Sequence, residues 1–103
     1  MPSRRSLPRL SAKETLILEL LIERDEMYGL QLVTASKGKL KRGTIYVTLG
    51  RMEEKKYVTS RLEDAPAEAG GMPRRLYEPT ALGRRVLDAW AHALRHFASE
   101  LAR

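Results

Sequence analysis

Apolar residues recur every three or four positions through the first part of the chain, which is the spacing of one face of an α-helix. The positions that form and widen this stripe are Leu16, Ile17, Leu18, Leu20, Leu21 and Ile22. Ser11 precedes the stripe and Glu14 follows Ser11 by three residues, the pattern of a capping box. We therefore expect a first helix that begins at Ser11 and is buried on more than one side.

Two further helices are expected before residue 57. Apolar residues at helical spacing favour a short second helix over Tyr28–Ser36. Lys37–Lys41 contains Gly38 and predicts a turn. A third helix is expected from about Arg42 to Lys56, with an apolar side formed by Ile45, Leu49 and Met52.

The pattern then changes to one that favours β-strands. Tyr57–Glu63 and Arg74–Pro79 are enriched in aromatic, β-branched and other strand-forming residues. The segment between them, Asp64–Pro73, holds two prolines and the pair Gly70-Gly71, which predicts an exposed loop. We expect a β-hairpin with a long tip.

A final helix is expected from a Thr80 cap to Arg103. Its apolar residues, spaced by alternating threes and fours, are Leu87, Trp90, Leu94, Phe97 and Leu101. This stripe is too long for so small a domain to cover alone, so we expect it to form the interface of a two-fold homodimer.

Three helices followed by a hairpin is the order of a winged helix-turn-helix, in which the third helix enters the DNA major groove and the hairpin tip touches the flanking backbone. The expected fold class is mainly α with a small β-hairpin. We expect a basic flexible arm over 1–10, a winged helix-turn-helix DNA-binding domain over 11–79 and a C-terminal dimerisation helix over 80–103.

Composition narrows the function classes. The 103 residues suffice for one compact domain, and 43% hydrophobic with 31% charged residues is typical of a globular protein. The absence of cysteine excludes disulfides, thiolate zinc sites and cysteine nucleophiles. No apolar run approaches the roughly 20 residues of a membrane span, and the N-terminal residues lack the apolar stretch of a signal peptide. We expect a cytoplasmic protein.

The net charge of +6 arises entirely within residues 37–61. That stretch holds two acidic residues, Glu53 and Glu54, against the basic residues Lys37, Lys39, Lys41, Arg42, Arg51, Lys55, Lys56 and Arg61. A local excess of this kind is typical of a surface that binds a polyanion. The alternative is an ordinary solvated surface.

The side of the third helix opposite its apolar positions is the expected DNA-facing side, and it presents Gly43, Tyr46, Val47, Gly50, Arg51 and Glu54. The two glycines leave it bare for close approach to a duplex. Tyr46 is a candidate donor to a phosphate or packs against the hairpin, and Val47 is a candidate contact for a thymine methyl group. Arg51 either pairs with guanine, lies on a phosphate or forms an ion pair with Glu54.

Phosphate contacts are expected on both sides of this helix. The candidates at its start are Lys37, Lys39, Lys41, Arg42 and Thr44, where the positive end of the helix dipole favours an anion. The candidates on the hairpin are Arg61, Arg74 and Arg75. These residues would position a duplex rather than read its sequence. Solvated surface charge is again the alternative.

These segments resemble the PadR-like transcriptional regulators over roughly Leu10 to Leu101. The matching segments are Met27-Tyr28-Gly29-Leu30, then Gly43-Thr44-Ile45-Tyr46 with Leu49, Arg51, Met52 and Glu53, and then Arg74-Arg75-Leu76-Tyr77 with Thr80 and Gly83. The chain departs from the family where Lys41 and Arg42 replace a frequent Ser and Pro, and where Tyr57 replaces a frequent Gly.

The resemblance implies a homodimer built by the C-terminal helix, bound to a two-fold operator, commonly as a repressor that a small molecule or a cellular signal relieves. It also makes Trp90 and Phe97 candidates for binding a small aromatic effector. Aromatic residues at helical spacing are more often simply core.

Other chemistry finds little support in the sequence. His92 and His96 are four residues apart, but no further histidine or cysteine completes a metal site. No nucleophile and base pair and no phosphate-binding loop has the spacing of an active site. We therefore expect no cofactor, no metal and no enzymatic activity. The rival interpretation is a winged-helix module that binds RNA or a protein partner without operator specificity.

Overall fold

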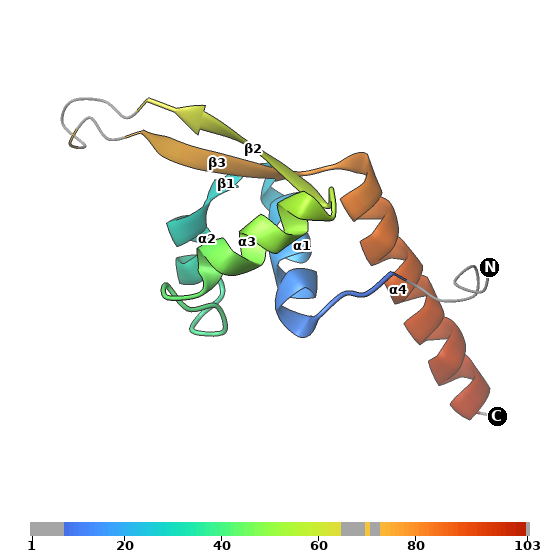
Figure 1. Ribbon diagram of the computed structural model, residues 1–103. Helices are drawn as coiled ribbons and strands as arrows, with labels where there is room; N and C mark the ends of the chain where they lie inside the picture. The colour runs from blue at the N-terminus through green and yellow to red at the C-terminus, as the bar shows by residue number, and fades with distance from the viewer. Residues whose placement is uncertain (1–7, 65–69, 71–72, 103) are drawn as a thin grey trace.

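The computed structural model describes residues 8–64, 70 and 73–102 of the chain (Figure 1). The elements are α1 Ala12–Arg24, β1 Met27–Tyr28, α2 Gly29–Ala35, α3 Ile45–Glu54, β2 Val58–Glu63, β3 Arg74–Pro79 and α4 Ala81–Leu101. The predicted mainly α fold with a small hairpin is confirmed. Most of the expected basic arm, including Arg4 and Arg5, and most of the expected hairpin tip lie outside the described residues.

Helix α1 forms the centre of the fold, as its wide apolar stripe predicted. The Ser11 hydroxyl accepts a hydrogen bond from the Glu14 backbone N–H at 3.1 Å, and the Glu14 carboxylate accepts one from the Ser11 N–H at 2.8 Å. This confirms the capping box. Ile17, Leu18 and Leu21 are fully buried in a single core with side chains from α2, α3 and the sheet.

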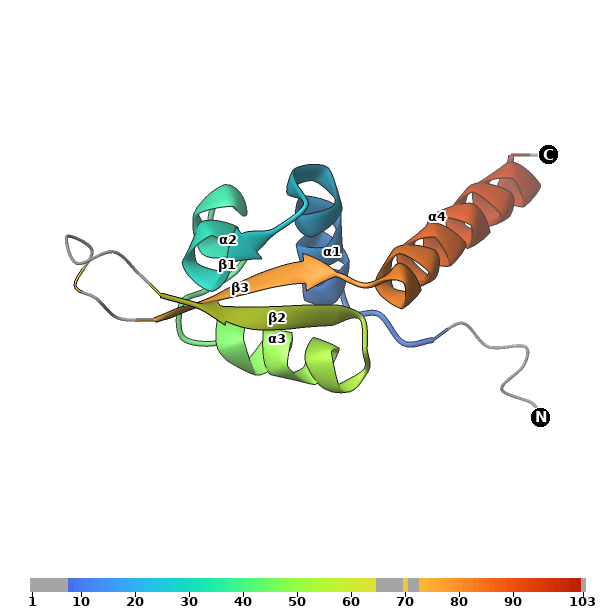
Figure 2. The ribbon, with the colours of Figure 1, turned by 90° about the horizontal axis from the view of Figure 1, so that it is seen from above.

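The three strands form an antiparallel sheet in the order β1-β3-β2. In the hairpin, Val58 pairs with Pro79 and Glu63 with Arg74, so β2 and β3 match along their full length. The sequence did not predict β1, a two-residue strand in which Met27 pairs with Tyr77. The sheet lies across one side of α1, α2 and α3, while α4 points away from them (Figures 1 and 2).

Helix α3 begins at Ile45, three residues later than the sequence predicted. Residues 42–44 form a turn in which the Thr44 N–H donates to the Lys41 carbonyl at 3.2 Å. Thr44 has φ −126° and ψ −7° and its side chain makes no capping hydrogen bond. Arg42 and Gly43 therefore lie in the approach to the helix and not on its face.

Helix α3 ends in a Schellman motif without glycine. The Tyr57 N–H donates to the Met52 carbonyl at 2.9 Å, and the Lys56 N–H donates to the Glu53 carbonyl at 3.0 Å. Lys56 takes the left-handed conformation with φ 69°, which glycine usually supplies at this position. The chain then turns directly into β2.

Helix α4 packs on the core only through its first turns. The Thr80 hydroxyl caps it by accepting from the Gly83 N–H at 2.9 Å, as predicted. Gly83 and Val86 are buried, while the rest of the helix is partly or fully exposed. A Cβ on Gly83 would lie 2.2 Å from the Tyr57 carbonyl oxygen, so only glycine lets α4 approach the start of the hairpin this closely.

Candidate nucleic-acid interface

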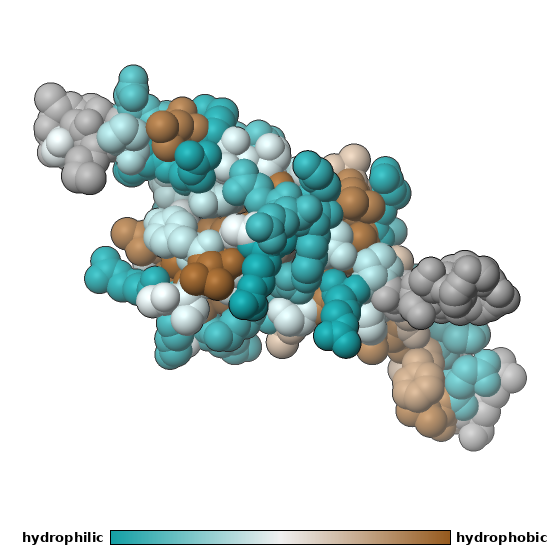
Figure 3. Space-filling view, viewed as in Figure 1, coloured by the Kyte–Doolittle hydropathy of each residue, from teal (hydrophilic) through white to brown (hydrophobic). Residues whose placement is uncertain are grey.

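Helix α3 separates its side chains into a buried side and an exposed side. Ile45, Leu49 and Met52 are in the core. Tyr46 and Val47 on the other side are 50% and 56% exposed. Arg51 is exposed and Gly50 is partly exposed on the same helix. Figure 3 shows this face of the molecule, where a small hydrophobic area is surrounded by hydrophilic surface.

The two glycines near this face are not required by packing. A Cβ built on Gly50 or on Gly43 meets no atom within 4 Å. Gly50 lies inside the helix, where glycine costs about 1 kcal/mol relative to alanine. The fold therefore gives no reason for glycine at Gly50, which is consistent with a face that something approaches closely.

Tyr46 is held by the start of α2 rather than lying free. A Cβ on Gly29 would lie 2.6 Å from the Tyr46 ring, so Gly29 provides the space that the ring occupies. Tyr46 also lines a groove with Tyr28, Arg74 and Arg75, which joins the exposed side of α3 to the hairpin. The role of Gly29 in seating Tyr46 was not predicted, although Gly29 lies in the segment Met27-Tyr28-Gly29-Leu30 that resembles the family.

The hairpin arginines differ in their surroundings. The Arg74 guanidinium lies over the Tyr28 ring, 4.2 Å from the ring centroid, and Arg75 donates to the Ser60 hydroxyl at 3.1 Å. Arg61 forms ion pairs with Glu26 at 3.0 Å and with Glu63 at 3.2 Å. Acidic side chains thus balance the charge of Arg61, while Arg74 and Arg75 have no ion-pair partner within residues 8–64, 70 and 73–102.

Lys55 is also engaged. Its ammonium lies 2.7 Å from the Glu14 carboxylate, which is buried at the start of α1. Burial of the Glu14 carboxyl group opposes its ionisation, but Lys55 and the Ser11 N–H outweigh burial and hold the pKa of Glu14 below its ordinary value of 4.5. Glu14 was predicted only as a capping residue, and its pairing with Lys55 joins α1 to the end of α3.

Six basic residues of the 37–61 stretch have no ion-pair partner within the described part of the chain: Lys37, Lys39, Lys41, Arg42, Arg51 and Lys56. All six are exposed, and four of them lie in the approach to α3 beside Thr44, which is exposed as well. The unbalanced positive charge is thus concentrated around the exposed side of α3. Arg51 is free of the ion pair with Glu54 that the sequence left open.

The candidate effector residues on α4 have different surroundings. Trp90 is partly buried against the core, and its indole N–H donates to the Pro8 carbonyl at 2.8 Å. Phe97 is two turns further along and 62% exposed. His96 lies 3.9 Å from Glu100, and the described residues contain no group of three side chains able to hold a metal ion. None of the described helices is long and apolar enough to cross a membrane.

A model of the Transcriptional regulator PadR-like family matches residues 17–89. Among solved structures, the chain is similar to a PadR family transcription regulator from Clostridium difficile, with 25% identity, a TM-score of 0.71 and coverage of 89% of this chain and 96% of that one. It is also similar to a PadR family transcriptional regulator from Eggerthella lenta, with 28% identity, a TM-score of 0.63 and coverage of 86% and 80%. A search of curated proteins found no match.

The family match spans the core helices, the whole hairpin and the packed half of α4, and the solved relatives share this arrangement. This match agrees with the predicted winged-helix fold. It also agrees with the prediction that the protein is not an enzyme, because the family consists of regulators of transcription. The chain belongs to the PadR-like family of transcriptional regulators.

Proposed function

We propose that this regulator binds double-stranded DNA in a sequence-specific manner, with α3 in the major groove and the hairpin against the flanking backbone. The observation that carries the proposal is the exposed side of α3, where Tyr46, Val47 and Arg51 are surrounded by basic residues that have no ion-pair partner in the described part of the chain. Arg51 and Val47 are suited to base edges and thymine methyl groups. The residues that contact the DNA phosphates are Lys39, Lys41, Arg42, Thr44, Arg74 and Arg75. The absence of a side chain at Gly43 and Gly50 allows the duplex to approach closely.

We propose that a second copy of the chain covers α4. Leu94, Phe97 and Leu101 are 62%, 62% and 71% exposed, and together with Leu87 and Trp90 they share one side of the helix. Figure 3 shows hydrophobic surface near the C-terminal end of α4. An apolar side repeated over this length fits a two-fold interface. We expect the two α3 helices of such a dimer to contact half-sites about one DNA turn apart, roughly 34 Å.

The regulatory role follows the family pattern: the dimer represses transcription in the cytoplasm, and a small molecule or a cellular signal relieves it. A flat aromatic effector would lie at the α4 interface, with Trp90 and Phe97 as its candidate contacts. Because Trp90 is the single tryptophan of the chain, titration with planar aromatic compounds can be followed by its fluorescence. A fluorescence response that is flat across the panel would exclude this effector class.

The DNA proposal is tested by selecting fragments from the source genome on the purified dimer and comparing the best fragment with a random duplex of equal length. We expect strong preference for the selected fragment and a steep loss of affinity with salt. Arg51→Ala is expected to lower the affinity for the selected fragment more than the affinity for the random duplex, whereas Lys39→Ala should lower both affinities alike. Equal binding of all duplexes, or preference for RNA or a protein, would refute the proposal.

A further inference from the structure

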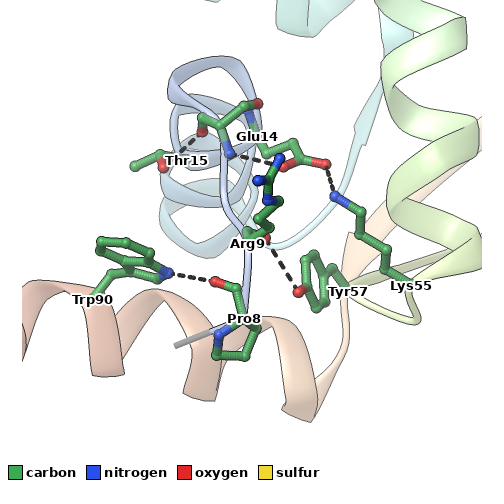
Figure 4. A network of polar contacts seen from close by, with 8 residues as sticks. Pro8, Arg9, Glu14, Thr15, Lys55, Tyr57 and Trp90 are labelled. Atoms are coloured by element: carbon green, nitrogen blue, oxygen red, sulfur yellow. Dashed lines mark hydrogen bonds and ion pairs between the residues drawn. The ribbon is translucent and has the colours of Figure 1, made fainter. Parts of the chain in front are cut away.

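Residues Pro8–Leu10 form a short strap that is fixed at two successive carbonyl groups (Figure 4). The Trp90 indole N–H donates to the Pro8 carbonyl at 2.8 Å, and the Tyr57 hydroxyl donates to the Arg9 carbonyl at 3.3 Å. Leu10 packs against the core. The strap therefore connects α4 with the end of α3, and its backbone position depends on both elements.

The strap borders a hollow of about 750 Å³ between the start of α1 and the exposed side of α3. Four of the side chains that line the hollow are basic: Arg9, Lys13, Arg51 and Lys55. Among the described residues, Glu14 is the one carboxylate in its lining, and it is already paired with Lys55. Arg9, Lys13 and Arg51 therefore keep an unbalanced positive charge around the opening, and Thr44 and Thr48 add hydroxyl groups.

We propose that this hollow is a second DNA-contact site, which binds backbone phosphates next to the groove that α3 reads. Charge complementarity selects the occupant, because Arg9, Lys13 and Arg51 have no acidic partner among the described residues, and the hydroxyls of Thr44 and Thr48 lie in the same lining. Val47 and Arg51 lie on the exposed side of α3 and also line the hollow, so a duplex against α3 reaches both surfaces. The inference rests on the DNA-binding function proposed above.

Trp90 and Tyr57 are positioning residues in this site. Neither contributes charge, but their hydrogen bonds fix the strap on either side of the Arg9 Cα, and the Arg9 side chain extends from the strap toward Glu14 and Lys55 (Figure 4). The indole N–H of Trp90 thus holds the strap in the position from which Arg9 contacts the DNA backbone. This gives Trp90 a role that does not depend on an effector.

The test measures binding of the full chain to two 30-bp duplexes, one selected from the source genome and one random, over a range of salt concentrations. Arg9→Ala and Lys13→Ala are each expected to lower the affinity for both duplexes by about tenfold at low salt. Each should also reduce the salt slope, the steepness with which log affinity falls with log salt concentration, by about 0.9 per protomer. Arg24→Ala is the matched control, because it removes the same charge about three helical turns along α1 from Lys13. We expect it to leave the affinity and the slope unchanged.

The strap is tested separately with Trp90→Phe, which keeps an aromatic ring and removes the N–H donor. We expect a loss of affinity close to that of Arg9→Ala, with no further loss when the two changes are combined. Because Trp90 also lies on the apolar side of α4, the affinities are compared at concentrations at which sedimentation shows both proteins to be in the same oligomeric state. Full affinity in Arg9→Ala and Lys13→Ala overturns the phosphate site. Additive losses overturn the positioning role. If the wild-type chain fails to prefer the selected duplex, the proposed function fails, whatever these variants show on the random duplex.

Discussion

Gly50→Ala is the change for which the structure predicts opposite effects on stability and on DNA binding. Gly50 lies inside the ten-residue helix α3, and a Cβ at this position meets no atom within 4 Å. Alanine in a helix interior is favoured over glycine by about 1 kcal/mol. We therefore expect the free energy of unfolding to rise by about 0.5–1 kcal/mol, which in a domain of this size raises Tm by roughly 3–6 °C.

The same methyl group projects toward the proposed DNA-facing surface. Gly50 is partly exposed beside Val47 and Arg51, so a duplex in close contact with α3 would meet the added carbon. A single lost complementary contact at a DNA interface costs about 1–3 kcal/mol. We expect the affinity for the selected duplex to fall about tenfold, while the random duplex, held mainly through basic side chains, changes little.

Urea unfolding measures the first effect and fluorescence anisotropy with both duplexes measures the second. Gly50→Ser serves as a comparison, because it adds a similar volume with lower helix propensity. A Gly50→Ala protein that is less stable than the wild type would refute the packing argument. A more stable protein with unchanged affinity for the selected duplex would show that DNA does not approach α3 closely at this position.

Three other changes test the packing around the site. Gly83→Ala is expected to lower the free energy of unfolding by about 2 kcal/mol or more, because its Cβ would lie 2.2 Å from the Tyr57 carbonyl oxygen; urea unfolding checks this. Lys56 has the left-handed conformation with φ 69°, which glycine adopts without strain. Lys56→Gly is therefore expected to raise the free energy of unfolding by about 1 kcal/mol and to raise Tm, and an unchanged or lower Tm would contradict this. The lowered pKa of Glu14 stabilises the native state above pH 4.5, and this contribution is lost as the pH falls through the pKa of the folded state. Glu14→Gln should therefore lose less stability than the wild type below pH 4.5, as denaturation at a series of pH values will show.

The helices could be predicted from the sequence because their apolar positions repeat locally. Two features could not. The two-residue strand β1 exists only through its pairing with β3, which lies some 50 residues away, and two residues carry no alternation. The start of α3 depends on the backbone conformation at Thr44, and a threonine there suits a cap as well as a turn.

The location of the candidate site could be predicted from the sequence, but the ion pairs that its basic residues form could not. The basic excess of residues 37–61 lies around α3, as its position in the sequence indicated. Lys55 pairs with Glu14, 41 residues away in the chain, and Arg61 pairs with Glu26, 35 residues away, as well as with the neighbouring Glu63. Contacts between such distant residues are set by tertiary packing and leave no local pattern.

These pairings limit how many phosphates the 37–61 stretch can neutralise. Of its eight basic residues, Lys55 and Arg61 already lie beside carboxylates, so at most six are free to release counterions from DNA. Six contacts from this stretch contribute about 5 to the salt slope per protomer, because each phosphate contact contributes about 0.9. Arg61→Ala should then leave the slope unchanged, since Glu26 and Glu63 hold its guanidinium. A decrease in the slope with Arg61→Ala would mean that these ion pairs break on binding and that the hairpin rearranges to reach the duplex.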